Sequence, residues 1–202
     1  MLFNQLFRLT LEKSELSILA RLGSGSACRS LWDGCVEWEK GQREDGLDSF
    51  AHPYEAATSF LDSIGVGLLI FAKEKKKMSS RDAMLTTVKT SPLYSQWSKH
   101  VEQDLTDIKR AMSQHDFIRF GEIAEKNALA MHNTMLTSEP SINYCNASTL
   151  HYREKIWALR KTKCPIYFTQ DAGPNIKLLF QKESLSVVKE EFPSAEIIFL
   201  SR

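Results

Sequence analysis

The sequence predicts an α+β fold in which helices pack on an antiparallel sheet, and three observations support this prediction. Apolar segments of strand length occupy residues 64–71, 165–169, 176–181 and 196–200. A long central stretch between the first two of these segments has the apolar spacing of helices instead. The chain has 202 residues, of which 43% are hydrophobic and 25% charged, and this composition is sufficient to build a globular core.

Each further element follows from its own local pattern. Helices are predicted at residues 2–7, 12–22, 81–90, 92–113, 116–136, 147–161 and 183–191, where apolar side chains recur every three to four positions. A further strand is predicted at residues 34–38, and the polar residues 40–53 form a loop or hairpin. Asp116 is a suitable N-terminal cap, Pro92 suits a first helical turn, and the lysine run at 73–77 indicates a solvated turn.

Charge and cysteine content exclude several classes of function. The formal net charge is +1, so no global field attracts nucleic acid or an acidic membrane, and no basic stripe accompanies the four tryptophans. The four cysteines form no CxxC pair and have no histidine at zinc-finger spacing, which indicates reduced, mostly buried thiols and no metal site. The longest apolar run, near residues 65–72, is too short to span a membrane, and the N-terminus is not typical of a signal peptide. We therefore expect a cytoplasmic protein.

A candidate anion site lies in the segment GSGSACRS, at residues 23–30. If Ser26 caps a new helix, the free N–H groups of its first turn lie beside the hydroxyls of Ser24 and Ser26. Arg29 would lie in the same turn, and a guanidinium with helix-terminal amides can bind a phosphate or a carboxylate. A plain helix start with a solvated arginine is the alternative interpretation.

Two further segments could take part in chemistry. Asp171 follows an apolar strand and opens the segment DAGPN, where an aspartate beside a glycine turn can act as a base or an electrostatic partner. An ordinary turn between two hairpin strands would look the same. Ser80, followed by Arg81, could cap a helix and offer its hydroxyl to an anion, or could be a structural cap only. His132 lies among apolar helical neighbours and is interpreted as a packed histidine.

Four segments resemble the diphosphomevalonate decarboxylase family. They are LSILARLGSGSACRSLWDGCVEWEKG, KKKMSSRDAMLTTVKTS, EKNALAMHNTML and PIYFTQDAGPNIKLLF, in the family's order and covering nearly the whole chain. The combination of GSGSACRS, VEW and DAGPN is specific to this family, which shares its fold with the GHMP kinases. The resemblance implies that residues 1–60 are a remnant of the N-terminal GHMP domain and residues 61–202 are the C-terminal domain.

The resemblance also implies a reaction. Family members use ATP, with Mg²⁺, to phosphorylate the tertiary hydroxyl of mevalonate 5-diphosphate, and phosphate and carbon dioxide then leave to give isopentenyl diphosphate. Asp171 matches the catalytic aspartate that orients or deprotonates the hydroxyl, and Arg29 matches the arginine that faces the carboxylate. The substrate-binding residues implied are Ser24, Gly25, Ser26, Ala27, Cys28, Arg29 and Ser80, with Arg81 next to Ser80 where some members carry threonine.

The start of the chain departs from the family pattern. Family members begin with a lysine-bearing strand and a Gly/Ser-rich loop for the ATP phosphates, whereas residues 1–21 resemble the helix that follows this loop. We therefore expect a truncated chain that lacks this upstream part and is destabilised, or a split protein completed by a separately encoded N-terminal half. Family members are often dimers, so the resemblance also implies a homodimer as an alternative partner. The alternatives are an inactive remnant that only binds phosphorylated ligands, and a kinase or decarboxylase for a differently phosphorylated mevalonate; the aspartate in DAGPN favours a decarboxylase.

Overall fold

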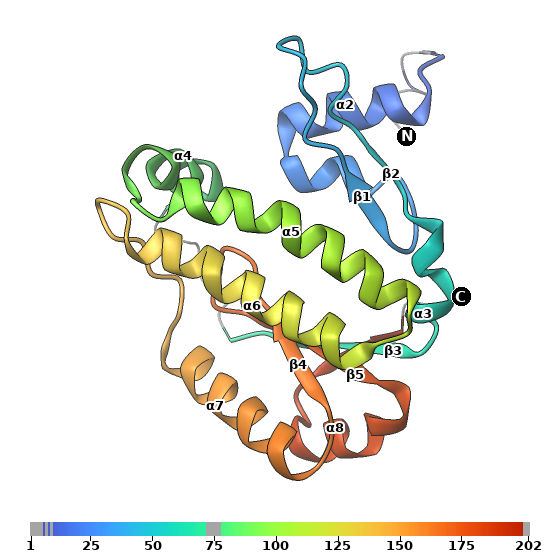
Figure 1. Cartoon of the computed structure of the whole chain (residues 1–202), viewed down its shortest axis with the longest axis vertical. Helices are drawn as coiled ribbons and strands as arrows, with labels where there is room; N and C mark the ends of the chain where they lie inside the picture. The colour runs from blue at the N-terminus through green and yellow to red at the C-terminus, as the bar shows by residue number, and fades with distance from the viewer. Residues whose placement is uncertain (1–5, 7, 9, 72–77, 200–202) are drawn as a thin grey trace. The chain divides into compact units, whose positions relative to one another are not determined.

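The structure is a computed structural model that describes residues 6, 8, 10–71 and 78–199. The chain divides into two compact units, with the boundary between Leu61 and Asp62 (Figure 1). Apart from Leu6, the helix expected at residues 2–7 lies outside the described residues, as does the lysine run at 73–77.

The first unit is built around a helix, a short turn and a hairpin. Its elements are α2 (Lys13–Gly23), the 3₁₀ helix η1 (Gly25–Arg29), β1 (Val36–Trp38), β2 (Ala51–Pro53), η2 (Glu55–Ala57) and α3 (Thr58–Leu61). β1 and β2 pair antiparallel, with Glu37 opposite His52. The strand expected at 34–38 is therefore confirmed over residues 36–38, and the segment 40–53, expected as a loop or hairpin, forms most of the connection and the second strand of a hairpin.

The second unit combines an antiparallel sheet with five α-helices among its described residues. Its helices are α4 (Ser80–Thr90), α5 (Tyr94–Ser113), α6 (Phe117–Leu136), α7 (Ala147–Thr162), η3 (Lys182–Ser184) and α8 (Leu185–Glu191). Its strands are β3 (Ile64–Leu69), β4 (Ile166–Thr169), β5 (Ile176–Gln181) and β6 (Glu196–Phe199), in the order β4-β5-β3-β6, and every neighbouring pair is antiparallel. The predicted α+β class is thus confirmed.

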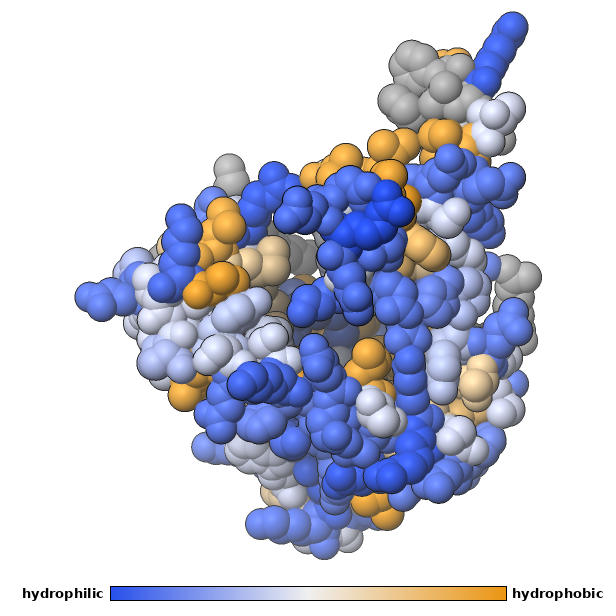
Figure 2. Space-filling model, turned by 45° about the horizontal axis from the view of Figure 1, so that its top comes forward, coloured by the Kyte–Doolittle hydropathy of each residue, from blue (hydrophilic) through white to orange (hydrophobic). Residues whose placement is uncertain are grey.

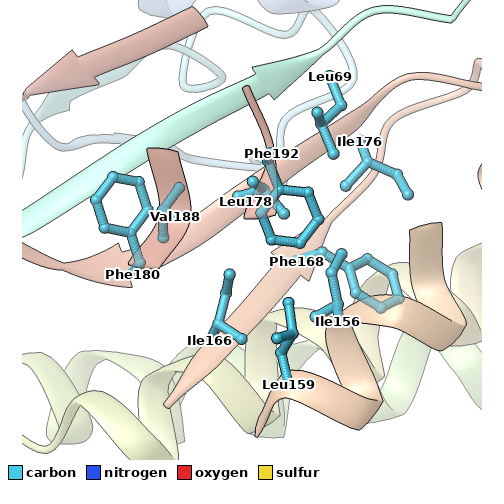
Figure 3. Packing of buried hydrophobic residues seen from close by; sticks show 10 residues of the cluster. All are labelled: Leu69, Ile156, Leu159, Ile166, Phe168, Ile176, Leu178, Phe180, Val188 and Phe192. Atoms are coloured by element: carbon cyan, nitrogen blue, oxygen red, sulfur yellow. The ribbon is translucent and has the colours of Figure 1, made fainter. Parts of the chain in front are cut away.

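The main core of the second unit lies between the sheet and helices α7 and α8 (Figure 3). Its fully buried side chains include Phe168 and Phe180 from the sheet, Ile156 from α7 and Phe192 from the end of α8. The other side of β4 faces α6, where the ring of Tyr167 lies directly against Gly121. β4 is therefore buried from both sides, with α7 against one face and α6 against the other.

Most predicted helices and strands are confirmed within one or two residues, since their periodicity is local. Asp116 caps α6, because its carboxylate accepts a hydrogen bond from Arg119 N at 2.9 Å. Pro92 does not open α5, which begins at Tyr94; Pro92 lies in the turn before it. Figure 1 shows α5 and α6 side by side, with β4 and β5 beneath α6.

The surface has no broad apolar face in the view of Figure 2, where hydrophilic residues predominate and hydrophobic residues form small groups. Within the described part of the chain, none of the helices combines the length and the apolar character that crossing a membrane requires.

Candidate active site

The Ser-Arg turn, residues 24–29, follows α2 without a break. Ser24 N donates to Ala20 O at 3.0 Å, which ends α2, and Ala27 N donates back to Ser24 O at 2.9 Å, which starts η1. Ser24 and Ser26 are exposed and their hydroxyl oxygens lie 3.2 Å apart. Two neighbouring hydroxyls at the surface can therefore bind the same polar ligand.

A buried serine anchors this turn from below. Ser17 of α2 is fully buried; its hydroxyl donates to Cys28 O at 3.1 Å and accepts from Ala51 N at 2.8 Å. Cys28 is also fully buried, and its thiol donates to Gly25 O at 3.0 Å. Ser17 therefore connects α2, the Ser-Arg turn and β2. Sequence reasoning missed this role.

The predicted capping role of Ser26 is wrong. Ser26 lies inside η1, where Ser24 holds the cap position without a side-chain hydrogen bond, and the helix has only five residues. Such a short helix adds little dipole, so any attraction for an anion must come from the exposed Arg29 and the two hydroxyls. Gly25 and Ala27 are partly exposed between them, and a side chain at Gly25 would crowd the Trp38 ring, at 3.1 Å.

The second predicted anion site lies at the start of α4. Ser79, and not Ser80, is the cap: its hydroxyl oxygen accepts from Asp82 N at 3.1 Å. Ser80 is the first helical residue and is partly exposed, while Arg81 is exposed. The capping prediction was wrong by one residue, because either of two adjacent serines satisfies the local capping pattern.

Asp171 lies two residues beyond the end of β4, in the connection to β5. Its side chain is 83% exposed and forms an ion pair with Lys177 of β5. An exposed pair of this kind contributes at most about 1 kcal/mol to stability. Sequence reasoning missed Lys177, although its place at the start of a strand that follows a tight connection could have indicated it.

The main chain around Asp171 is held much more firmly than its side chain. Gln170 is 2% exposed, and its amide nitrogen donates to Gly173 O at 2.6 Å. Arg153 of α7 donates to the other end of the same amide at 2.5 Å, and Thr149 donates to Pro174 O at 2.8 Å. The connection between β4 and β5 is thus fixed to α7 by buried side chains.

His132 of α6 contacts the same connection. It is 4% exposed, and its Nε2 lies 3.1 Å from Asp171 O. Burial, assisted by the nearby positive charge of Arg153, lowers the pKa of His132 to about 4, so the ring is neutral at neutral pH. The interpretation of His132 as a packed histidine is confirmed, but its polar contact was not foreseen.

The structure distributes the predicted site residues over two units. Ser24, Gly25, Ser26, Ala27, Cys28 and Arg29 share one turn in the first unit, while Ser80, Arg81 and Asp171 lie in the second. The roles that the resemblance implies for Arg29 and Asp171 stay predictions.

Metal-ligating side chains come together on the hairpin of the first unit. Carboxylate oxygens of Glu37 and Glu39 and a ring nitrogen of His52 lie within 4.8 Å of one another. His52 Nε2 is 3.1 Å from the Glu39 carboxylate, which raises the pKa of His52. A surface ion pair across the strands accounts for this arrangement.

All four cysteines are free. Cys28 is buried, whereas Cys35, Cys145 and Cys164 are partly exposed. The expectation of mostly buried thiols was therefore wrong.

Comparison with solved structures shows to which class of protein the fold belongs. Of the solved structures that are similar to the chain, one is described as "MDDEF in complex with MVAPP, AMPPCP and Magnesium"; it is 36% identical, with a TM-score of 0.90 over 98% of this chain and 62% of that one. The mevalonate diphosphate decarboxylase from Enterococcus faecalis is 35% identical, with a TM-score of 0.88 over 98% of this chain and 61% of that one. The fold is therefore that of the mevalonate diphosphate decarboxylases of known structure, which is the GHMP-kinase type expected from the sequence.

The sequence matches then give the family. Residues 66–197 match the mevalonate 5-diphosphate decarboxylase C-terminal domain, and residues 1–51 match the diphosphomevalonate decarboxylase-like N-terminal domain. The diphosphomevalonate decarboxylase of Debaryomyces hansenii is 37% identical over 188 residues, which are 91% of this chain and 48% of that protein. The chain belongs to the diphosphomevalonate decarboxylase family, and it spans about half the length of the curated relatives it matches.

The described residues do not provide a site for the ATP and Mg²⁺ expected from the sequence. Phosphate groups of nucleotides are typically bound where a glycine-rich loop opens a helix, but within the described residues glycine-rich sequence opens only the five-residue η1. The hairpin cluster includes an imidazole, whereas Mg²⁺ prefers oxygen ligands. No step of the chemistry is therefore assigned to a nucleotide held by these residues.

Proposed function

We propose that this chain takes part in the decarboxylation of mevalonate 5-diphosphate to isopentenyl diphosphate, in the mevalonate pathway of isoprenoid synthesis. The observation that carries the proposal is the succession of two family domains, matched at residues 1–51 and 66–197; the first contains the Ser-Arg turn, and the second contains Ser80, Arg81 and Asp171. Residues 1–60 then belong to the N-terminal domain and residues 61–202 to the C-terminal domain.

The Ser-Arg turn binds the substrate in this proposal. Arg29 faces the substrate carboxylate, because a guanidinium can donate two parallel hydrogen bonds to a carboxylate. The hydroxyls of Ser24 and Ser26 and the main chain of Gly25, Ala27 and Cys28 surround the polar end of the same ligand. The exposure of Arg29 and both serines supports this role. Ser80 and Arg81 then bind the diphosphate.

Asp171 acts on the tertiary hydroxyl, which it orients or deprotonates. When phosphate and the carboxylate leave neighbouring carbons, positive charge develops at the carbon that loses phosphate, and a nearby carboxylate stabilises it. The exposed side chain of Asp171 on a firmly held main chain is suited to both tasks, since a fixed charge needs no reorganisation during the reaction.

ATP with Mg²⁺ is the phosphate donor that family membership implies, and it is assigned to none of the described residues. A separately encoded N-terminal half that carries the phosphate-binding loop is the partner we propose for this step. A cytoplasmic location likewise remains a prediction.

Calorimetric titration of the chain with mevalonate diphosphate tests the binding role. Loss of a charge-assisted contact costs about 1.5–3 kcal/mol, so Arg29→Ala should weaken binding by roughly 10- to 150-fold. Arg43→Ala is the matched control, because Arg43 is an exposed arginine of the same unit that pairs with Asp45. Equal affinity of the Arg29→Ala variant and the wild-type chain would refute the assignment.

Phosphate release tests the catalytic role. The chain, mixed with the N-terminal part of a family member, should release phosphate from ATP only when mevalonate diphosphate is present. Asp171→Asn should abolish this release and leave the binding constant within about threefold, because the amide keeps the shape of the carboxylate but loses its charge. Release at the wild-type rate by Asp171→Asn would contradict the role of Asp171.

A second candidate function is binding of phosphorylated mevalonate without turnover. The exposed hydroxyls and guanidinium of the Ser-Arg turn support it, because they can bind a phosphorylated or carboxylate ligand without a nucleotide. Titration and phosphate release separate the two candidates, because only the enzyme couples substrate binding to loss of phosphate from ATP.

A further inference from the structure

We propose that His132 is a positioning residue for Asp171, and that its imidazole N–H holds the main chain of the DAGPN loop (residues 171–175) in place. This inference rests on the proposed function for the importance of Asp171, but its structural part stands without it. His132 lies on α6, 39 positions away from Asp171 in the sequence, and no local pattern connects the two residues.

The hydrogen bond fixes the chemistry of the ring. The partner of Nε2 is the main-chain oxygen of Asp171, at 3.1 Å, and a carbonyl oxygen can only accept a hydrogen bond. Nε2 must therefore carry the proton. Since burial keeps the ring neutral, this N–H is the single donor of the side chain, and it is used on the DAGPN loop.

The acceptor is shared with the loop itself. Gly173 N donates to the same Asp171 oxygen at 2.8 Å, which closes a tight turn over residues 171–173. His132 binds this closed turn to α6 from the buried side, and the carboxylate of Asp171 extends from it into solvent, where 83% of it is exposed. The imidazole of His132 thus constrains the peptide group between Asp171 and Ala172, which lies next to the Cα atom that carries the carboxylate.

Two other buried side chains donate hydrogen bonds to carbonyl oxygens further along the DAGPN loop. Gln170 donates to Gly173 O and Thr149 donates to Pro174 O, at 2.6 and 2.8 Å. With His132, three main-chain oxygens of one short loop accept hydrogen bonds from α6, from α7 and from Gln170, which directly follows β4. A catalytic side chain must be held close to its productive geometry by such support, and a misplacement of about 1 Å can cost on the order of 100-fold in rate.

The bond to Asp171 explains why a polar residue, His132, occupies this position. It lies in a helix face with the buried Ala128 and Met135, and it is itself 4% exposed, so an apolar side chain would fill the same space without the cost of burying an imidazole. The bond to Asp171 compensates for this cost. The position therefore favours a donor that serves the loop over a side chain that merely fills the core.

The tautomer of His132 in the wild-type chain is the first test. Long-range proton–nitrogen NMR correlation of the imidazole should show the Nε2–H tautomer at neutral pH. The Nδ1–H tautomer would overturn the proposal. This measurement needs neither a variant nor catalytic activity, so its failure is distinct from failure of the proposed function.

Amide exchange of Gly173 is the second test. Loss of one hydrogen bond to the shared carbonyl should loosen the turn, so Gly173 N–H should exchange roughly 3- to 10-fold faster in His132→Phe. His132→Gln keeps an N–H donor on a side chain of similar reach and should exchange at nearly the wild-type rate. His100→Phe, at an exposed histidine of α5, is the matched control. An unchanged exchange rate of the Gly173 amide in His132→Phe would refute the positioning role. If His132→Phe does not fold, the same measurement is made on His132→Leu, and a wild-type exchange rate there would refute the role.

The third test links the loop to the reaction. In the phosphate-release assay, His132→Phe should lower kcat by roughly 10- to 100-fold with little change in KM, and His132→Gln should restore most of kcat. A purely structural role would instead reduce the amount of folded protein and leave kcat per folded molecule unchanged. Faster Gly173 exchange with wild-type kcat would overturn the positioning role in the reaction.

Discussion

Replacing Gly121 in α6 by alanine should have two opposed effects on the stability of the protein. Alanine favours a helix over glycine by about 1 kcal/mol, so the substitution would stabilise an exposed helix. In this protein, however, a Cβ atom at Gly121 would lie 2.1 Å from Cδ2 and 2.3 Å from Cγ of Tyr167. Carbon atoms in contact normally lie about 3.5–4.0 Å apart, so the overlap exceeds about 1 Å.

The Tyr167 ring cannot easily move away from the new methyl group. It is 3% exposed on β4, with the guanidinium of Arg160 stacked 3.9 Å from its centroid and Phe117 packed edge-on at 5.8 Å. Overpacking at such a site costs about 1–3 kcal/mol and occasionally more, because either the helix or the ring must shift. An overlap with ring atoms near the main chain belongs at the upper end of this range. We therefore expect a net loss of about 2 kcal/mol after the gain in helix propensity.

Thermal and urea unfolding of the purified chain measure this loss. For a unit of this size about 2 kcal/mol corresponds to a fall of roughly 6 °C in Tm. Gly23→Ala is the control, because Gly23 also lies in a helix but an added Cβ would meet nothing within 4 Å. A Gly121→Ala chain as stable as the wild type, or more stable, would show that α6 and β4 do not make this close contact.

Three further substitutions test other parts of the packing. The pKa of His132 falls from 6.5 to about 4 on folding, so the unfolded chain takes up the proton first as the pH is lowered. About 3 kcal/mol of the free energy of unfolding should therefore be lost between pH 6.5 and pH 4. In urea titrations at different pH values, His132→Gln should lack this part of the pH dependence. Glu125→Ala should cost about 3 kcal/mol in the same assay, because it leaves Arg160 without its buried carboxylate. The control Glu122→Ala, at an exposed carboxylate, should cost less than about 1 kcal/mol. Equal losses of stability in the two variants would contradict this reasoning. Ser17→Ala removes a fully buried hydroxyl that makes two hydrogen bonds to the main chain. The substitution should lower stability by about 1–3 kcal/mol and weaken the binding of mevalonate diphosphate. Unchanged stability would exclude the anchoring role.

The elements that the sequence predicted well are those determined by neighbours along the chain. Apolar spacing located α6 and α7 to within one residue at each end, and the strand at 176–181 has the predicted limits. The family motifs in turn identified Asp171 and Arg29 as candidates, and the matches to family domains confirm the family itself.

The prediction failed where two local patterns were equivalent. Ser79 and Ser80 both satisfy a capping pattern, and the choice of Ser79 depends on a reciprocal bond between its hydroxyl and Asp82. Ser26 resembles a cap, but the chain tightens into η1 as soon as α2 ends, so no new α-helix forms for it to cap. The first outcome depends on a single residue of register and the second on the type of helix that forms, and propensities resolve neither.

The residues that hold the site could not be predicted, because their partners are distant in sequence. Ser17 and Ala51 are 34 positions apart, and His132 and Asp171 are 39 apart. The signal that was available is the same for both: a polar residue stands among the apolar residues of a helix. Such a residue must find a hydrogen-bond partner when it is buried, but the sequence does not reveal which one.

These two buried residues support the candidate site by the same physical means. Each binds main-chain oxygen in a segment whose functional side chains are exposed: Ser17 holds Cys28 O below Arg29, and His132 holds Asp171 O below its carboxylate. The surroundings constrain an exposed side chain only weakly, so the main chain that carries it largely determines its position. Because a buried donor or acceptor left without its partner costs about 1–3 kcal/mol, loss of either anchor should release the segment above it while most of the core stays folded. Substitutions at Ser17 and His132 should therefore resemble weakened versions of those at Arg29 and Asp171, although neither side chain needs to contact the substrate.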